Sequence, residues 1–356
     1  MEGQEFGVVF VHLGTEHPPT LQAFSSYLQE TSYYPHRFLI TDKKNSDLRF
    51  EGEVITTSEI SQAGKSLLRS KPYYRKVASG YWLNAFERLF ALRAIAENPH
   101  LPSGPIIHLE SDVMPLFDAT DIEFLRTNFS RTAVPRFSET LGIGSIVFFP
   151  NVQELISTLD ALEKLAIDNR NQIRNDMELL GMALNRGLLM ELPSHPSDYD
   201  KVLYRSNGEH KVLFDGAALG QFLFGQDPFH QSGLRVSGFI NPSYALRTKI
   251  ESIRWGIQFN KGQSELIACF NEDKFKVANI HVHSKEVLPP LSSNSKRWKR
   301  AIDEANGKVE RLHELSNITS PHSKKLNLWL RIQIARSNGL NQALHRCLLR
   351  FFNRMR

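Results

Sequence analysis

The sequence predicts an α/β fold, with a mainly parallel sheet covered by helices on both faces and a small helical region at the C-terminus. Three observations lead to this class. Short apolar runs alternate with helical stretches over residues 6–149, a turn sequence joins two further strands near residue 260, and the proline pair 289–290 interrupts the pattern. Strands that alternate with helices usually form parallel sheets, because each helical crossover lets the next strand run in the same direction.

Local patterns place the elements in order. We expect strands at residues 6–13, 36–42, 53–57, 105–109 and 144–149, and helices at residues 20–31, 79–98, 152–166 and 175–186. The first strand is an uninterrupted apolar run. Leu21, Phe24 and Leu28 then repeat at helical spacing, while Ser79 and Pro99 are the start and stop signals of the long helix.

The second half of the chain is more helical before it returns to strands. We expect a helix at 217–223, a hairpin of strands 254–259 and 265–270 around an Asn-Lys-Gly-Gln turn, and a closing strand at 277–283. The proline pair and a serine-rich patch at 292–295 then divide the chain into residues 1–288, a single domain, and residues 296–356, a helical basic region.

Composition limits the class of protein. The chain has 356 residues, of which 41% are hydrophobic and 23% charged, so it is globular rather than intrinsically disordered. Its two cysteines, Cys269 and Cys347, exclude a disulfide scaffold and a zinc ribbon and fit a reducing compartment. No run of about 18 uncharged apolar residues is present, and residues 1–5 lack a basic signal-peptide segment. We therefore expect a cytoplasmic protein.

The net charge of +5 is concentrated at one end. Residues 324–356 contain eight lysines and arginines and no acid, which leaves 5 − 8 = −3 for the rest of the chain. A mildly acidic main domain argues against nucleic acid as a partner, because duplex-binding enzymes line their clefts with basic residues.

The first chemical motif lies at the end of a predicted buried strand. Glu110 and Asp112 follow residues 105–109 directly, and ligands of open α/β sheets bind at the carboxyl ends of strands. Hard divalent cations such as Mg²⁺ or Mn²⁺ take carboxylate oxygens and leave positions for phosphate. The alternative is that both acids merely cap the following turn.

The second motif is an alternating polar face. Asn279, His281, His283 and Lys285 lie on one side of an extended segment, because successive side chains of a strand point to opposite faces. Neutral imidazole is a good ligand for an ion such as Mn²⁺, and a nearby lysine neutralises a diphosphate. The alternative is a strand face in contact with solvent.

The third motif begins at Asp215. Small residues at 216, 217, 218 and 220 let the start of a helix approach another segment closely, and Gln221 follows them. Asp215 stands where either a helix N-cap or a substrate-binding carboxylate is found, and both interpretations stay open.

These three motifs, in this order, resemble bacterial nucleotide-sugar glycosyltransferases of the GT-A type. The resemblance covers residues 6–286 and rests on an arginine-containing helix at 86–90, the strand-end acids, the DGAALGQ segment at 215–221 and the HVHSK strand at 281–285. The family pattern at the strand end is usually Asp-x-Asp. Here it is Glu110-Ser111-Asp112, which keeps the metal-binding second acid and changes the first, whose family role is a ribose contact.

The resemblance implies a metal-dependent enzyme that moves a sugar from a nucleotide donor, a UDP-sugar, to a hydroxyl acceptor such as a surface glycan. Mn²⁺ or Mg²⁺ is held by Asp112 with His281 or His283, of which we favour His281. Lys285 faces the β-phosphate, and Asp215 is the acceptor-binding residue or base, with Asp227 behind it. The remaining donor-binding residues implied are Phe10, His12, Gly14, Asp42, Arg88, Glu110, Ser111 and Gln221. Phe10 as a core residue and Arg88 as the partner of a neighbouring acid are the alternatives.

The C-terminal residues 326–356 interleave leucine, tryptophan and phenylalanine with arginine. Such an amphipathic segment lies in an anionic membrane interface, where each basic side chain contributes about 1 kcal/mol of attraction. It would bring the protein to the inner face of the membrane and to a lipid-linked acceptor. The alternative, to which we give equal weight, is that this segment packs on the domain or on another subunit.

Two other functions are compatible with the same residues. One is a metal-dependent phosphoesterase that uses Asp112, His281 and His283, although such enzymes generally need a second metal. The other is a non-catalytic scaffold that binds a nucleotide or sugar at the membrane.

Overall fold

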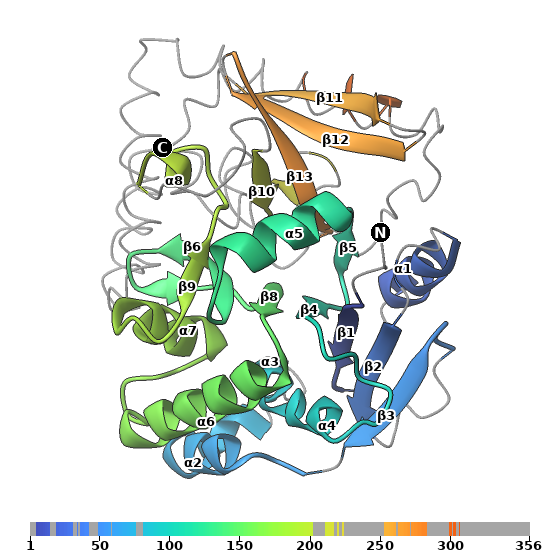
Figure 1. Cartoon of the computed structure of the whole chain (residues 1–356). Helices are drawn as coiled ribbons and strands as arrows, with labels where there is room; N and C mark the ends of the chain where they lie inside the picture. Colours follow the sequence, from blue (N-terminus) through green and yellow to red (C-terminus); the bar gives the residue numbers. More distant parts are fainter. Residues whose placement is uncertain are drawn as a thin grey trace, which may run out of the picture.

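The computed structural model describes most of the first 201 residues and selected segments beyond them. The described residues are 5–14, 19–30, 34, 36–42, 49–57, 59–75, 81–201, 211–216, 219–220, 223, 253–260, 263–270, 272–282, 299–300, 302–303 and 306. They form two β-sheets and a set of helices (Figure 1).

The elements follow in chain order. The helices are α1 (Pro19–Glu30), α2 (Gln62–Ser70), the short 3-10 helix η2 (Pro72–Arg75), α3 (Tyr81–Ala91), α4 (Arg93–Ala96), α5 (Ala119–Asn128), α6 (Val152–Asp168), α7 (Asp176–Asn185) and α8 (Asp198–Lys201). The strands are β1 (Gly7–His12), β2 (His36–Asp42), β3 (Glu53–Thr57), β4 (Ile106–Glu110), β5 (Val113–Pro115), β6 (Ala133–Ser138), β7 (Leu141–Gly142), β8 (Ile146–Phe149), β9 (Met190–Leu192), β10 (Val212–Phe214), β11 (Ile253–Asn260), β12 (Gln263–Phe270) and β13 (Asp273–His281).

The larger sheet has the strand order β3-β2-β1-β4-β8-β6-β7, with β9 beside β6. Strands β3, β2, β1 and β4 are parallel, and β8 runs antiparallel to both β4 and β6. The predicted class, a mainly parallel sheet, is therefore confirmed. Because β1, β2 and β4 run in one direction, the residues that follow them meet at one edge of the sheet.

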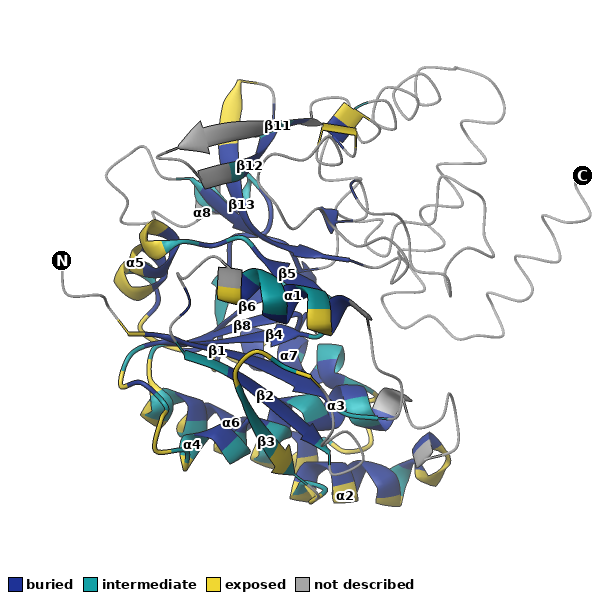
Figure 2. Ribbon diagram, turned by 90° about the vertical axis from the view of Figure 1, so that its right-hand side faces the viewer, coloured by how far each residue is buried: buried dark blue, intermediate teal, exposed yellow. Residues whose placement is uncertain are grey.

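Both faces of this sheet are covered (Figure 2). Alternate residues of β1 enter different cores: Val8 and Phe10 pack with α1, α5 and the second sheet, whereas Val9 and Val11 pack with α2, α3, α4, α6 and α7. This division follows from the period of two along a strand. It explains why β1 is buried along its whole length and reads Gly-Val-Val-Phe-Val-His, with apolar residues facing both cores.

The second sheet was not anticipated as a separate unit. Its order is β10-β13-β12-β11, and β5 pairs with β13. The hairpin of β11 and β12 is confirmed, with Asn260 opposite Gln263. Strand β13 starts earlier than the expected closing strand, at Asp273, and ends at His281. The sheet was missed because β5 and β10 have only three residues each.

The helical predictions hold with two differences. The helix expected at 79–98 is divided into α3 and α4 at Leu92, whose backbone angles stay in the helical region (φ −58°, ψ −18°). Helices α2 and α5 were missed, although α5 begins with a sequence signal. Asp118 and Asp121 form a capping box, in which the carboxylate of each residue accepts the backbone N–H of the other.

The described part of the C-terminal region packs on the second sheet. Ile302 is buried in its core, and the Asn306 side chain accepts the backbone N–H of Trp255 (2.8 Å) and donates to its carbonyl (3.3 Å). The helix expected at 217–223 lies largely outside the described residues, and the basic segment 324–356 lies wholly outside them. None of the helices in the described ranges has the length and hydropathy required to cross a bilayer.

Candidate metal centre and donor site

Three side chains from distant parts of the chain meet beyond the carboxyl end of β4. Glu110, Asp112 and His281 each offer one ligand atom, and these atoms all lie within 4.8 Å of one another. The Nε2 atom of His281 is 3.3 Å from Asp112 Oδ1 and 3.7 Å from Glu110 Oε2. Within the described residues this is the single group of three or more acids, histidines or cysteines with such spacing.

Strand pairing brings the two motifs together. Asp112 precedes β5, which pairs antiparallel with the end of β13, so His281 lies opposite Val113. The backbone N–H of Val282 donates to the Asp112 carbonyl (2.8 Å), and that of Glu110 to Ser145 (3.0 Å). Backbone hydrogen bonds of the two sheets thus fix the chain on either side of the candidate ligands.

The residues fit a hard divalent cation. Two ligands that each lie about 2.1 Å from an octahedral ion are about 3 Å apart, close to the His281 to Asp112 separation of 3.3 Å. Two carboxylates with one imidazole suit Mn²⁺ or Mg²⁺, whereas a zinc site would be favoured by more nitrogen and sulfur ligands. For Glu110, the resemblance implies a donor contact, whereas its position at the strand end also allows a metal ligand. The structure places it among the candidate ligands.

The electrostatic field of this cluster favours positive charge. Burial lowers the pKa of His281, but the carboxylates of Asp112 and Glu110 and a hydrogen bond to Gly216 outweigh burial and raise the pKa to about 9. The carboxylates that stabilise a proton on the imidazole would equally stabilise a metal ion in front of it.

Arg88 completes the charge arrangement. Its Nη2 atom lies 2.9 Å from Glu110 Oε1, and both side chains are mostly shielded from solvent, with 17% and 12% exposed. Of the two roles considered for Arg88, the ion pair with a neighbouring acid is therefore present, but inside the site rather than on the surface. One oxygen of Glu110 faces Arg88 and the other faces His281.

Sequence reasoning missed Asp176, a buried acid at the start of α7. Burial raises its pKa to about 6, Arg88 opposes that shift and Glu110 reinforces it. Asp176 therefore lies within the electrostatic reach of the site. The local signal was the Asn175 N-cap followed by an acid. This pattern is typical of any helix start, so the sequence did not identify Asp176 as a residue near the site.

The expected nucleoside residues lie at the ends of β1 and β2. The Gly14 N–H donates to Asp42 Oδ2 (3.3 Å), and Thr41 donates to the His12 carbonyl (2.9 Å), so these two strand ends are tied together. Gly14 has φ +114°, a conformation that favours glycine. Phe10 is fully buried in the core and contacts Phe50 edge to face, which is the alternative considered for it.

Two further predicted site residues, Ser111 and Asp215, make contacts within the protein. Ser111 lies between the acids, and its carbonyl accepts the Thr20 hydroxyl at the start of α1 (3.0 Å). Asp215 is 1% exposed, and its carboxylate accepts backbone N–H groups of Leu219, Gly220 and His281. An N-cap side chain accepts from the second or third residue of its helix, whereas Asp215 accepts from residues four and five positions ahead and from β13, so its carboxylate joins β13 to the segment after β10. Gln221, Asp227, His283 and Lys285 lie outside the described residues.

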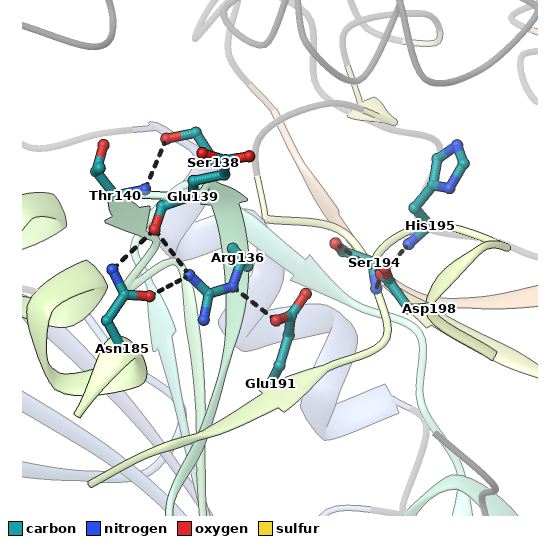
Figure 3. Close-up of polar contacts among 9 residues, drawn as sticks. All are labelled: Arg136, Ser138, Glu139, Thr140, Asn185, Glu191, Ser194, His195 and Asp198. Carbon is teal, nitrogen blue, oxygen red and sulfur yellow. Dashed lines mark hydrogen bonds and ion pairs between the residues drawn. The ribbon is translucent and has the colours of Figure 1, made fainter. Parts of the chain in front are cut away.

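A second polar cluster holds the residue types of a hydrolase triad without its geometry (Figure 3). Asp198 accepts the backbone N–H groups of Ser194 (3.0 Å) and His195 (2.9 Å), and the His195 ring points away from it. His195 Nδ1 instead contacts the Ser197 hydroxyl at 2.7 Å. A triad requires the acid on the imidazole and the imidazole on the nucleophile, so this cluster stabilises the turn before α8.

The fold and site define an α/β protein with an acid and imidazole cluster at the carboxyl edge of its main sheet. No protein-family model matches the chain, and no curated protein matches it in sequence.

Solved structures with a similar arrangement include two glycosyltransferases and a nucleotidyltransferase. They are mouse xyloside xylosyltransferase 1 (12% identity, 57% of this chain and 95% of that one, TM-score 0.33), an active-site mutant of LgtC (9%, 85% and 95%, 0.38) and a putative glucose-1-phosphate thymidylyltransferase from Bacillus anthracis (11%, 52% and 85%, 0.30). Similarity at this level concerns the fold and not the activity.

Proposed function

We propose that the chain is a metal-dependent glycosyltransferase that moves a sugar from a nucleoside diphosphate donor, a UDP-sugar, to a hydroxyl acceptor. The observation that carries the proposal is the convergence of Glu110, Asp112 and His281 at the carboxyl edge of the sheet. That edge is where α/β folds bind nucleotides, and the cluster combines the ligand types that a metal diphosphate requires.

Several side chains of the protein would contribute to donor binding, each in a different way. Glu110, Asp112 and His281 would hold Mn²⁺ or Mg²⁺. When bound, that ion neutralises the negative charge that develops on the diphosphate leaving group. Arg88 holds one oxygen of Glu110 in place and adds positive charge beside the donor. His12, Gly14 and Asp42 are near enough to one another to line the base and ribose pocket.

The proposal also includes residues that the structure does not describe. Lys285 would face the β-phosphate, Gln221 would contact the donor, and His283 is the second histidine that could hold the metal; these assignments rest on the sequence pattern and the resemblance. Residues 324–356 would bring the domain to an anionic membrane surface and a lipid-linked or surface-glycan acceptor. The chain would then act at the cytoplasmic face of that membrane.

Turnover assays test the proposal. The full chain is incubated with Mn²⁺ and UDP-, GDP- and CMP-sugars, and release of nucleotide is measured with and without hydroxyl acceptors. We expect Mn²⁺-dependent release from a UDP-sugar by the wild type and none by Asp112→Asn. The matched control is Asp160→Asn, whose side chain is 62% exposed and paired with Arg93.

Each outcome points to one function. Acceptor-dependent release supports a transferase. Cleavage of simple phosphoesters without sugar transfer would identify a phosphoesterase, and UDP binding without turnover of any donor would identify a scaffold. Equal activity of the wild type and Asp112→Asn would remove the metal centre from the reaction.

A further inference from the structure

Asp215 lies next to the candidate metal centre, and its carboxylate is buried against backbone N–H groups. It is 1% exposed, Oδ1 accepts the Leu219 N–H (2.8 Å), and Oδ2 accepts both the Gly220 N–H (2.7 Å) and the His281 N–H (3.0 Å). Hydrogen bonds from backbone N–H groups to a buried carboxylate are among the stronger ones in proteins. This carboxylate therefore joins the segment after β10 to the last residue of β13.

Asn279, two residues before His281 on β13, also joins β13 to Asp215. It is fully buried, its amide Nδ2 donates to the Asp215 carbonyl (2.8 Å), and its Oδ1 accepts the Asp215 N–H (3.0 Å). The register of β10 against β13 shifts between Leu213 and Phe214. The Asn279 side chain thus replaces the strand-to-strand hydrogen bonds that this irregularity would otherwise lose.

The same turn fixes the imidazole of His281. Its Nδ1 atom is 2.9 Å from the Gly216 carbonyl, and a carbonyl only accepts, so Nδ1 carries a hydrogen. The other ring nitrogen, Nε2, then faces Asp112 and Glu110. A metal-ligating histidine usually has its second nitrogen fixed in this way, which sets both the ring orientation and the ligand atom.

Gly216 and Gly220 are closely packed against neighbouring segments. A Cβ atom on Gly220 would lie 2.0 Å from the His281 carbonyl oxygen, and one on Gly216 would lie 3.0 Å from Pro135. The small residues noted in the sequence after Asp215 therefore let this segment approach the end of β13. The backbone of His281 is held by Asp215 and its ring by Gly216.

We propose that Asp215 and Asn279 are positioning residues that present Nε2 of His281 to the metal, and that Asp215 is not the catalytic base. This inference rests on the proposed metal-dependent function. Partners behind a metal ligand typically contribute about 10- to 100-fold to metal affinity. We expect a loss of that size from either substitution.

The primary test uses Asp215→Asn, which turns an N–H donor toward one or more backbone N–H donors. The dissociation constant for Mn²⁺ alone is measured by titration calorimetry on the full chain. Asp198→Asn is the matched control, because Asp198 is also buried and also accepts two backbone N–H groups, in the turn before α8. We expect Mn²⁺ affinity to fall about 10- to 100-fold in Asp215→Asn and to stay unchanged in Asp198→Asn.

A second measurement reports on the ring itself. In histidine-¹⁵N-labelled protein, the His281 Nδ1–H signal is assigned by its absence from His281→Gln, and its exchange with solvent is followed. We expect slow exchange in the wild type and in Asp198→Asn, and fast exchange in Asp215→Asn. Where Asp215→Asn does not fold, Asn279→Ser carries both measurements, because it removes the reciprocal pair and leaves the carboxylate.

The outcomes separate this inference from the proposed function. A wild type that binds no Mn²⁺ overturns the metal centre, and the exchange measurement still decides whether Asp215 and Asn279 fix the ring. Mn²⁺ affinity and Nδ1–H exchange that are both unchanged in the variants would overturn the positioning role. Loss of turnover in Asp215→Asn with both readouts intact would identify Asp215 as the base and overturn our inference.

Discussion

The Nε2 atom of His281 lies 3.3 Å from Oδ1 of Asp112, although β4 and β13 belong to different sheets. The pairing of β5 with β13 accounts for this proximity, since β5 starts one residue after Asp112 and its first residue lies opposite His281. The two residues are brought together by strand register, which is one of the more strongly specified features of a buried sheet.

Arg88 should be required for donor use and not only for stability. Arg88→Gln removes the cation beside Glu110 and Asp176, so we expect donor turnover to fall at least ~10-fold, the rate equivalent of about 1.4 kcal/mol. Arg88→Lys should restore part of the activity, because lysine keeps the charge but not the planar fork. Steady-state kinetics with a UDP-sugar measure both variants.

The control for that variant is Arg93→Gln. Arg93 also pairs with carboxylates, Asp160 and Glu163, but on the exposed side of α4 and α6. Equal losses of turnover in Arg88→Gln and Arg93→Gln would show that the effect of Arg88 is not specific to the site.

Lys276 should contribute strongly to stability. Its ammonium lies 2.5 Å from Asp118 and 2.7 Å from Asp121, and Lys276 and Asp121 are 7% and 0% exposed. Lys276→Met leaves two carboxylates without their buried cation, a change that costs about 3–5 kcal/mol of unfolding free energy. Lys211→Met breaks the exposed pair with Asp273 and should cost less than ~1 kcal/mol. Urea unfolding compares the two, and equal losses would contradict the role of burial.

The same group gives a pH dependence with a defined sign. Burial raises the pKa of Asp118, but Lys276 and the backbone N–H groups of Asp121 and Thr120 outweigh it, so the pKa lies below its usual 3.8. The unfolded chain therefore takes up this proton at a higher pH than the folded chain. The stabilisation is present above pH ~4 and is lost as the pH falls through the folded pKa.

Urea unfolding at several pH values tests this dependence. The difference in unfolding free energy between the wild type and Lys276→Met should be largest near pH 8 and shrink as the pH falls, because without Lys276 the buried carboxylates take up protons in the folded variant, and below about pH 4 the wild type loses its own stabilisation. A difference that grew as the pH fell would have the wrong sign for our assignment.

The basic C-terminal segment should direct the chain to anionic surfaces. Replacing Arg350, Arg354 and Arg356 with glutamine removes three charges, each contributing about 1 kcal/mol near an anionic bilayer. We expect weaker co-sedimentation with phosphatidylserine vesicles and unchanged hydrolysis of a soluble UDP-sugar. Unaltered sedimentation would favour the alternative, in which this segment packs on the protein.

Much of the main sheet could be predicted because its strands are locally distinctive. Strands β2 and β3 have the expected bounds. Successive apolar residues of β1 face the two cores in turn, as a sheet covered on both faces requires. The second sheet could not be predicted in the same way. Strands of three residues carry no periodicity, and their pairing with β13 is a long-range contact.

The candidate site was predictable to a similar degree. Asp112 stood out by its position after a buried strand and His281 by the alternating polar face to which it belongs, and the structure brings them together. Asp176 could not be identified from the sequence as a residue near the site, because acids are common in the first turn of any helix. The sequence left Asp215 undecided between a cap and a substrate contact, because its actual hydrogen bonds, from the backbone N–H groups of residues 219, 220 and 281, depend on the tertiary structure.

The position of a bound Mn²⁺ tests the central claim most directly. Crystals of the full chain, grown with Mn²⁺ and UDP, are measured at the manganese absorption edge. We predict one anomalous peak about 2.0–2.3 Å from Glu110, Asp112 and Nε2 of His281, and no peak there in Asp112→Asn. A peak held by other residues, or one that persists in that variant, would contradict our account.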